Sequence, residues 1–231
     1  MKNTSKGNYR KQEFLTAALE LLSEKGYEKT TIQDIIDKMG VSKGAFYHYF
    51  ISKEDVIEQI AQEYAERGIG IMRRIADRKD LDAIEKINTI IKMINEYKGS
   101  REKERIKIKR IFKGDKNLKL ERKITKAIRH DALIIYHEIL NAAIKEKSIK
   151  KSNTRELAEF TANIIHNLND SIDQLVEEFN ADEEGFYSRE FIRRLEEKLI
   201  FYEDTLSRLY ELKGRKILLR EAYLERFLKE K

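Results

Sequence analysis

The chain has no proline in 231 residues, and this absence constrains its fold more than any other feature. Proline lacks a backbone N–H and clashes with the preceding helical turn, so a chain without it can extend helices through most of its length. Glycine is also scarce, with 10 residues, and 38% of the residues are charged, as is typical of long helices with one solvated face. We therefore predict an all-α fold with little or no sheet.

Several classes of protein are disfavoured by what the sequence lacks. There is no cysteine, so disulfides, thiolate metal sites and cysteine nucleophiles are excluded. No apolar run approaches the roughly 18 residues that span a membrane, and residues 1–9 are polar, which predicts a cytoplasmic protein without a membrane partner. A di-iron helical bundle needs glutamate three residues before histidine, but Ala127, Ile134 and Asn163 stand there. We expect no enzyme activity, no catalytic residue, no metal and no cofactor.

The first 55 residues contain four closely spaced helix starts. Apolar residues at helical spacing predict helices over residues 9–25, 31–39, 42–50 and 52–77. Hydroxyl side chains stand at the last three starts, where they can cap free backbone N–H groups. Longer helices are then expected at about residues 81–97, 101–112, 116–147, 153–179, 188–213 and 215–229. The change in helix length predicts two domains, 1–52 and 53–231.

The third short helix has two faces of different chemistry. Phe46, Tyr49 and Phe50 recur at steps of three and four residues, which places them on the core side. Two short helices joined by a glycine-containing turn, the second small and polar on its outer side, match a helix-turn-helix that enters a DNA major groove ~12 Å wide. The outer side presents Lys43, Gly44, Tyr47 and His48.

Each predicted DNA contact has a chemical role. Hydroxyls and a cation at helix starts would meet phosphate oxygens, whereas Tyr47 or His48 of the third helix would meet a phosphate or a base edge. Lys43 can donate to guanine, the Ala45 methyl can touch a thymine methyl, and Gly44 lets the backbone approach closely. The candidate DNA-binding residues are Thr30, Thr31, Ser42, Lys43, Gly44, Ala45, Tyr47, His48, Tyr49 and Lys53.

This segment resembles the TetR family of bacterial repressors, whose DNA-binding domain follows T-T-x-x-x-I-x-x-x-x-G-V-S-x-G-x-x-Y-x-[HY]-F-x-[SN]-K. The resemblance is dense, in register, and covers about residues 9–57. Two positions depart from the pattern: Ala45 stands where the family often has threonine, and Ile51 where a small or basic residue is common. The first departure removes one possible hydrogen bond to DNA, and neither threatens the fold.

The resemblance implies a function as well as a fold. It implies an N-terminal three-helix helix-turn-helix domain, followed by a larger helical-bundle domain for dimerisation and effector binding. The expected function is a sequence-specific transcriptional regulator, a homodimeric repressor that a small-molecule effector releases from a palindromic double-stranded DNA operator. The alternative is a helical scaffold or nucleic-acid-binding protein without effector control. Candidate ligand-binding residues, all polar or amphipathic on helices with an apolar face, are Tyr97, Tyr136, His137, Asn163, His166 and Asn167.

The last two long helices carry apolar residues at steps of three and four, as in a coiled-coil seam. Such a seam favours a four-helix bundle between two copies, and the alternative is packing within one copy. The candidate dimer-interface residues are Leu157, Ile164, Leu168, Ile172, Leu175, Leu195, Leu199, Tyr202, Leu206 and Leu209.

The net charge of +6 is unevenly distributed. Residues 1–55 carry a net charge of only +1, whereas residues 98–129 contain 14 lysines and arginines against 4 acidic residues. This basic segment has three interpretations: a solvated face, a contact with flanking DNA, or an attraction for an anionic effector. Bulk charge is therefore not the expected source of DNA affinity, which should come from placed donors and from dimerisation.

Overall fold

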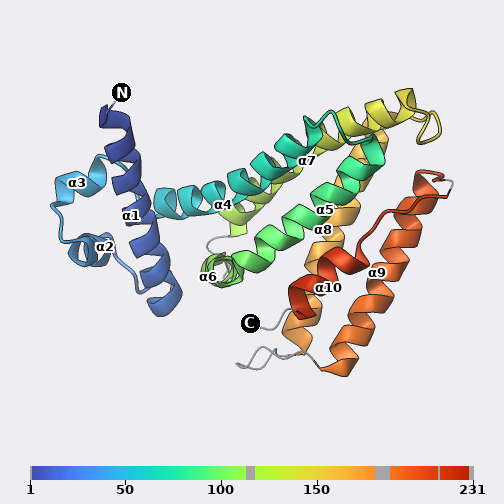
Figure 1. Cartoon of the computed structure of the whole chain (residues 1–231). Helices are drawn as coiled ribbons and strands as arrows, with labels where there is room; N and C mark the ends of the chain where they lie inside the picture. The colour runs from blue at the N-terminus through green and yellow to red at the C-terminus, as the bar shows by residue number, and fades with distance from the viewer. Residues whose placement is uncertain (1, 113–117, 180–187, 213, 229–231) are drawn as a thin grey trace. The chain divides into compact units, whose positions relative to one another are not determined.

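The computed structural model describes residues 2–112, 118–179, 188–212 and 214–228 of the chain. Within these ranges all regular structure is helical, in ten helices labelled α1 to α10 in Figure 1. The predicted all-α fold is confirmed. Among the described residues, no helix is both long and apolar enough to cross a membrane.

Four helices open the chain: α1 (Lys2–Lys25), α2 (Ile32–Met39), α3 (Lys43–Tyr47) and α4 (Lys53–Ala76). Helix α1 begins earlier than predicted, and α3 ends at Tyr47 rather than at residue 50. The reason for the early end is a tightened turn, in which the N–H of Tyr49 bonds to the carbonyl of Phe46, three residues back, at 2.9 Å.

Six helices follow in the described ranges: α5 (Ala83–Ser100), α6 (Glu102–Phe112), α7 (Leu118–Lys145), α8 (Thr154–Glu178), α9 (Arg189–Leu209) and α10 (Arg220–Leu228). Contrary to expectation they are not uniformly longer, since α6 has 11 residues and α10 has 9, against 24 each in α1 and α4. The expected boundaries at residues 116, 213 and 229 lie outside the described residues. Among these six helices the largest difference is at α10, which begins five residues after the predicted start at Arg215.

Residues 214–219 do not form the predicted helix because side chains from other helices bind their backbone. The amide of Asn88 donates to the carbonyl of residue 216 at 3.1 Å and accepts the N–H of residue 218 at 2.9 Å. The buried carboxylate of Glu203 accepts the N–H groups of residues 219 and 220, at 2.7 and 2.8 Å. These bonds replace helical ones, so α10 starts only where Glu203 caps it.

The chain forms two compact units, and the first contains Met1–Arg67 and Arg101–Lys126. In this unit α1 packs against α2 and α6. The ring of Phe14 meets those of Phe46 and Phe50 edge-on, with centroids 6.0 and 5.8 Å apart, and all three rings are fully buried. Aliphatic side chains complete the same core: Leu15, Leu21, Leu22, Ile35, Ile36, Val56, Ile57, Ile60 and Ile111.

The second unit contains Gly68–Ser100 and Ala127–Lys231. Here α8 packs against α9, and α10 packs against both α5 and α9. The core is mainly aliphatic, with Ile84, Leu140 and Leu168 among its fully buried members. Two polar groups in this interior pair with each other, through a hydrogen bond of 2.6 Å between the buried hydroxyls of Thr161 and Tyr210.

The two units do not divide at residue 52, as the predicted domains 1–52 and 53–231 would. Helix α4 contributes residues to both units, and the change falls at Gly68. The physical reason is that Val56, Ile57 and Ile60 of α4 bury their side chains in the core of the short helices, together with Ile111 of α6. A boundary drawn from helix length alone does not detect these long-range contacts.

The predicted dimer interface is wrong for seven of its ten residues. Leu157, Leu168, Ile172, Leu175, Leu195, Leu199 and Leu206 are each no more than 7% exposed and belong to the core of the second unit. Ile164 and Tyr202 pack against that core, and only Leu209, at 37%, counts as exposed. The periodic spacing correctly marks an apolar face, but this face is covered within one chain.

Candidate nucleic-acid interface

Helix α2 is fixed at both ends by its own sequence. The Thr31 hydroxyl accepts the N–H of Asp34 at 3.1 Å, and the Asp34 carboxylate accepts the N–H of Thr31 at 2.7 Å, which completes a capping box. At the other end Gly40 has φ of 62°, a left-handed conformation that stops the helix. The chain then turns directly into α3.

Helix α3 presents the two faces that the sequence predicts. Ser42 caps it by accepting the N–H of Ala45 at 3.3 Å. Phe46 is fully buried on the inner side, and Phe50 follows it into the core. The side chains on the outer side are exposed: Ser42, Lys43, Gly44, Tyr47 and His48. This division of faces is confirmed.

Two residues next to the outer face differ from expectation. Tyr49, a candidate DNA contact, is half-buried, with its ring centroid 5.7 Å from that of Phe14, so most of its surface serves packing. Ile51, in contrast, is 83% exposed although it is aliphatic. Because Ile51 directly follows the outer face of α3, it is a candidate apolar contact with DNA. The set of DNA-binding residues predicted from the sequence does not include it. The sequence did contain a signal for this contact, because Ile51 stands where the family pattern has a small or basic residue.

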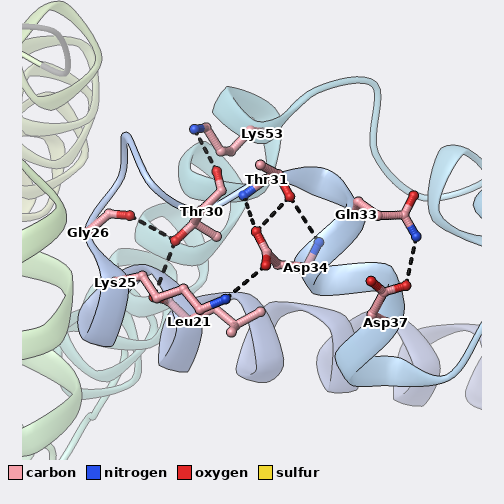
Figure 2. Close-up of polar contacts among 9 residues, drawn as sticks. All are labelled: Leu21, Lys25, Gly26, Thr30, Thr31, Gln33, Asp34, Asp37 and Lys53. Atoms are coloured by element: carbon pink, nitrogen blue, oxygen red, sulfur yellow. Dashed lines mark hydrogen bonds and ion pairs between the residues drawn. The ribbon is translucent and has the colours of Figure 1, made fainter.

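Thr30 occupies a buried position and not the phosphate-facing position predicted for it (Figure 2). Its hydroxyl donates to the carbonyl of Gly26 at 2.8 Å and lies 3.3 Å from the carbonyl of Leu21. A fully buried hydroxyl committed to the end of α1 cannot also reach a phosphate oxygen. The prediction that the Thr30 side chain contacts DNA is therefore wrong, because the hydroxyl satisfies orphan carbonyls of a helix end.

Lys53 is likewise committed to the fold. Its ammonium donates to the carbonyls of Tyr27 and Thr30, at 2.6 and 2.8 Å, and lies 3.9 Å above the centre of the Tyr27 ring. Figure 2 shows this amine reaching Thr30 from the start of α4. Two of its three protons are therefore used, and the side chain clamps the loop before α2. The Lys53 side chain therefore serves mainly to hold this loop, and not to contact a phosphate as predicted.

The clamp includes a polar partner on the far side of the same ring. The Tyr27 hydroxyl donates to the carboxylate of Glu54. Burial, and then this bond, raise the pKa of Tyr27 to about 12, while the same bond lowers the pKa of Glu54. Tyr27 and Glu54 therefore each keep one protonation state at neutral pH.

The exposed side of α2 carries negative charge. The Lys25 ammonium, 2.8 Å from Asp34, and the Thr31 hydroxyl hold the pKa of the Asp34 carboxyl far below its usual range. Asp37 accepts from Gln33 at 2.7 Å (Figure 2). These carboxylates do not attract phosphate, which supports the expectation that DNA affinity here comes from individually placed donors.

A substitution separates the structural role of Lys53 from a phosphate contact. Lys53→Met keeps the length of the side chain but removes both hydrogen bonds to the loop. We expect the free energy of unfolding of the full chain to fall by about 1–2 kcal/mol in urea titrations without DNA, since hydrogen bonds from charged groups contribute on this order. Lys29→Met, on the exposed part of the same loop, is the control and should unfold as the wild type does. Equal stability of both variants would refute the clamp.

The six candidate ligand residues lie in the second unit but have different surroundings. Tyr136 is buried, and burial raises its pKa. His137 contacts the Asn141 amide at 3.2 Å, and His166 lies 3.3 Å from the Asp170 carboxylate. The other three are Asn163, which accepts from Arg129, the half-buried Tyr97 and the exposed Asn167. These contacts do not bring the six together around one cavity, so their role stays a prediction.

The family model of bacterial regulatory proteins of the tetR family matches residues 14–60, which contain α2, α3 and the start of α4. An uncharacterized HTH-type transcriptional regulator of Bacillus subtilis, YvdT, is 45% identical over 62 residues, which are 27% of this chain and 31% of that protein. The HTH-type transcriptional repressor KstR2 of Mycolicibacterium smegmatis is 32% identical over 68 residues, 29% of this chain and 33% of the relative. The matched segment thus spans about a third of the length of these relatives.

Solved structures extend the likeness of fold beyond this segment. A putative TetR-family transcriptional regulator from Syntrophomonas wolfei superposes with a TM-score of 0.60 at 24% identity, over 87% of this chain and 95% of that chain. SmeT, the repressor of a Stenotrophomonas maltophilia multidrug efflux pump, gives a TM-score of 0.62 at 16% identity, over 88% and 91%. The two comparisons agree: residues 14–60 match the tetR family of bacterial regulatory proteins in sequence, and the fold of nearly the whole chain is similar to that of solved TetR-family regulators.

Proposed function

We propose that the chain is a sequence-specific DNA-binding transcriptional regulator that acts as a dimeric repressor in the cytoplasm. The observation that carries this proposal is the exposed outer face of α3, which holds a cation and two polar-tipped rings above a fully aromatic inner face. A short helix with this division of faces is suited to the major groove. We propose no catalytic role, and the named sequence relatives are described as regulators.

In the proposed complex, the outer face of α3 reads bases and its flanks hold the backbone. Lys43 donates to a guanine, and the hydroxyl of Tyr47 or the ring of His48 meets a phosphate or a base edge. Ser42 uses an oxygen lone pair to cap α3, which leaves its hydroxyl proton for a phosphate oxygen. Thr31 is positioned at the start of α2, although its own proton is given to Asp34. Exposed Ile51 adds an apolar contact beside them.

Lys43 is expected to specify sequence. Lys43→Gln should weaken binding to operator DNA about tenfold and relax the preference at one base pair, because a lysine–guanine contact contributes on this order. Lys145→Gln makes the same charge change on α7 in the second unit and should leave binding unchanged. The measurement is fluorescence anisotropy with the DNA upstream of the chain's own gene and single-base variants. Equal weakening for all sequences would assign Lys43 to the phosphate backbone instead.

We propose that two copies associate through the outer faces of α8 and α9. These helices pack against each other, and aromatic and aliphatic side chains remain exposed on them: Phe160 at 53%, Ile200 at 42% and Phe201 at 67%. Large exposed apolar groups on neighbouring helices are typical of an interface. A dimer would supply a second recognition helix for a palindromic operator, as a contact surface this small requires.

We propose further that an effector bound in the second unit acts on DNA binding through α4. The chain passes from one unit to the other within this helix at Gly68, and Gly70 follows in the same turn. Glycine weakens a helix interior, so bending there is less costly than elsewhere in α4. SmeT, which has a similar fold, has been solved in a complex with triclosan.

Gly68→Ala combined with Gly70→Ala tests the role of this segment. Space is available, because a Cβ at Gly68 would lie 3.9 Å from Ile94 and Tyr97, and at Gly70 3.6 Å from the mobile end of Arg74. We expect a gain of about 1 kcal/mol per site in the free energy of unfolding. Effector-dependent release from DNA should be lost while basal DNA binding persists. Normal release by an effector that acts on the wild type would contradict the proposal.

A further inference from the structure

A groove lies on the surface of the first unit, between α1 and α6. Its volume is about 460 Å³, within the range of small-molecule sites. One wall consists of Gln12, Thr16 and Leu19, which occupy a single face of α1. The other consists of the first turns of α6, and Arg67 of α4 closes one side. Every lining residue belongs to the first unit, so the groove is a feature of the proposed DNA-binding unit itself.

The groove carries a positive excess. Arg67, Arg101, Lys103 and Lys107 line it, against the two carboxylates Glu20 and Glu104. Three of these cations come from the basic segment 98–129, whose role the sequence left open, although residues 113–117 of that segment lie outside the described residues. Over the described part of the chain, Lys103 and Lys107 form no ion pair within 4 Å. The positive charge of the groove is therefore not neutralised by its own walls.

The two carboxylates are already engaged. Glu20 pairs with Lys38 at 2.7 Å, and this bond, together with the charge of Lys107, lowers the pKa of its carboxyl. Glu104 lies between Arg101, at 3.1 Å, and Arg67, at 3.4 Å. Both distances exceed the 2.7–2.9 Å or so of a strong charged hydrogen bond. Arg67 also lies 3.5 Å from the carboxylate of Glu63. Each guanidinium has five donors, so both arginines retain capacity for another anion.

We propose that this groove binds a small organic anion with at least two negative charges and a short apolar body. Arg67 and Arg101 would hold one anionic group in place of Glu104, and Lys103 and Lys107 would hold the second. Half-buried Leu19, which packs against the core of the unit, provides an apolar floor for the body of the ligand. Carboxylates and phosphates both meet this description.

A DNA strand is a poorer occupant than a compact anion. The groove is a concave site of limited volume, whereas a DNA backbone presents phosphates along an extended line. Glu20 and Glu104 would also repel a continuous row of phosphates, whereas a small ligand can place its charges only against the arginines and lysines. A bound anion would bridge α1 and α6 and so stabilise the first unit by preferential binding to its folded state.

The test titrates citrate and pyrophosphate, at constant ionic strength, into the full ¹⁵N-labelled chain without DNA. The amides of Thr16, Leu19 and Lys107 should shift and saturate with at least one of the two probes. Lys103→Gln with Lys107→Gln should raise the dissociation constant at least tenfold. Glu104→Gln should lower it, because it removes the competing carboxylate from Arg67 and Arg101. Saturation by citrate alone assigns a carboxylate ligand, and by pyrophosphate alone a phosphate ligand.

A matched control separates a built site from general attraction. Lys119→Gln with Lys126→Gln removes two charges from the same basic segment and the same unit, outside the groove. This variant should bind within twofold of the wild type, and equal weakening by both double variants would overturn the proposal. Failure of both probes to saturate would also overturn it. In that case, if Lys103→Gln with Lys107→Gln lowered only the salt dependence of DNA binding, the basic segment 98–129 would be assigned to a DNA contact. The proposed regulatory function would then stand.

Discussion

Replacing Phe46 with alanine is expected to unfold the first unit and abolish sequence-specific DNA binding. The Phe46 ring is fully buried between the rings of Phe14 and Phe50, with centroids 6.0 and 5.5 Å away. Truncating a buried phenylalanine costs about 3–5 kcal/mol, through lost burial and the cavity that remains. Domain stabilities are of order 5–15 kcal/mol, and this core is small, so the loss is a large share of the total.

The unfolding of this variant should be local. Circular dichroism should retain the signal of the second unit, whose core shares no residue with that of Phe46. The matched control is Tyr47→Ala, which truncates the neighbouring ring on the exposed face and should keep wild-type stability. A Phe46→Ala protein with wild-type urea unfolding and amide spectra of α2 and α3 would contradict the assignment of the inner face.

Phe201→Glu is expected to convert a dimer into a monomer and to weaken operator binding by about 100-fold. The Phe201 ring is 67% exposed on α9, and a carboxylate placed there cannot be buried at an interface without a large desolvation cost. A monomer retains only one recognition helix, so it loses the second half-site and most of its affinity. Sedimentation velocity and gel shift on the same preparations measure the two effects.

The control for this prediction is Leu228→Glu, which places the same charge at an exposed aliphatic position on α10. It should stay dimeric and bind DNA as the wild type does. A wild-type chain that is monomeric at micromolar concentration, or a Phe201→Glu variant that remains dimeric, would contradict the proposed interface. Phe160→Glu on α8 tests the same proposed interface independently.

Local interactions explain which parts of this molecule were predictable from sequence. The predicted hydroxyl cap at the start of α2 acts within a few residues, so its sequence signature survives in the fold as the cap made by Thr31. The faces of α3 were equally readable, because Phe46 and Phe50 are separated by one helical turn. The end of α3 was not readable, since it depends on how the carbonyl of Phe46 is shared between the N–H groups of Tyr49 and Phe50.

The errors share a different cause, which is dependence on distant partners. Lys53 looked like a phosphate contact because a lysine at a helix start has that chemistry, but the carbonyls of Tyr27 and Thr30 lie within its reach. Leu199 looked like part of a dimer seam, but its apolar face is covered within the chain. Spacing identifies a face and leaves the partner of that face open.

The most direct test of the proposed function is a selection of DNA sites from a random pool by the full chain, followed by footprinting on the DNA upstream of its gene. A dimer that inserts two copies of α3 should select a short palindrome and protect two half-sites about 34 Å apart, one helical turn. Lys43→Gln should change the selected base at one symmetric position. Binding without sequence preference, or tighter binding to RNA than to any selected DNA, would contradict the proposed function.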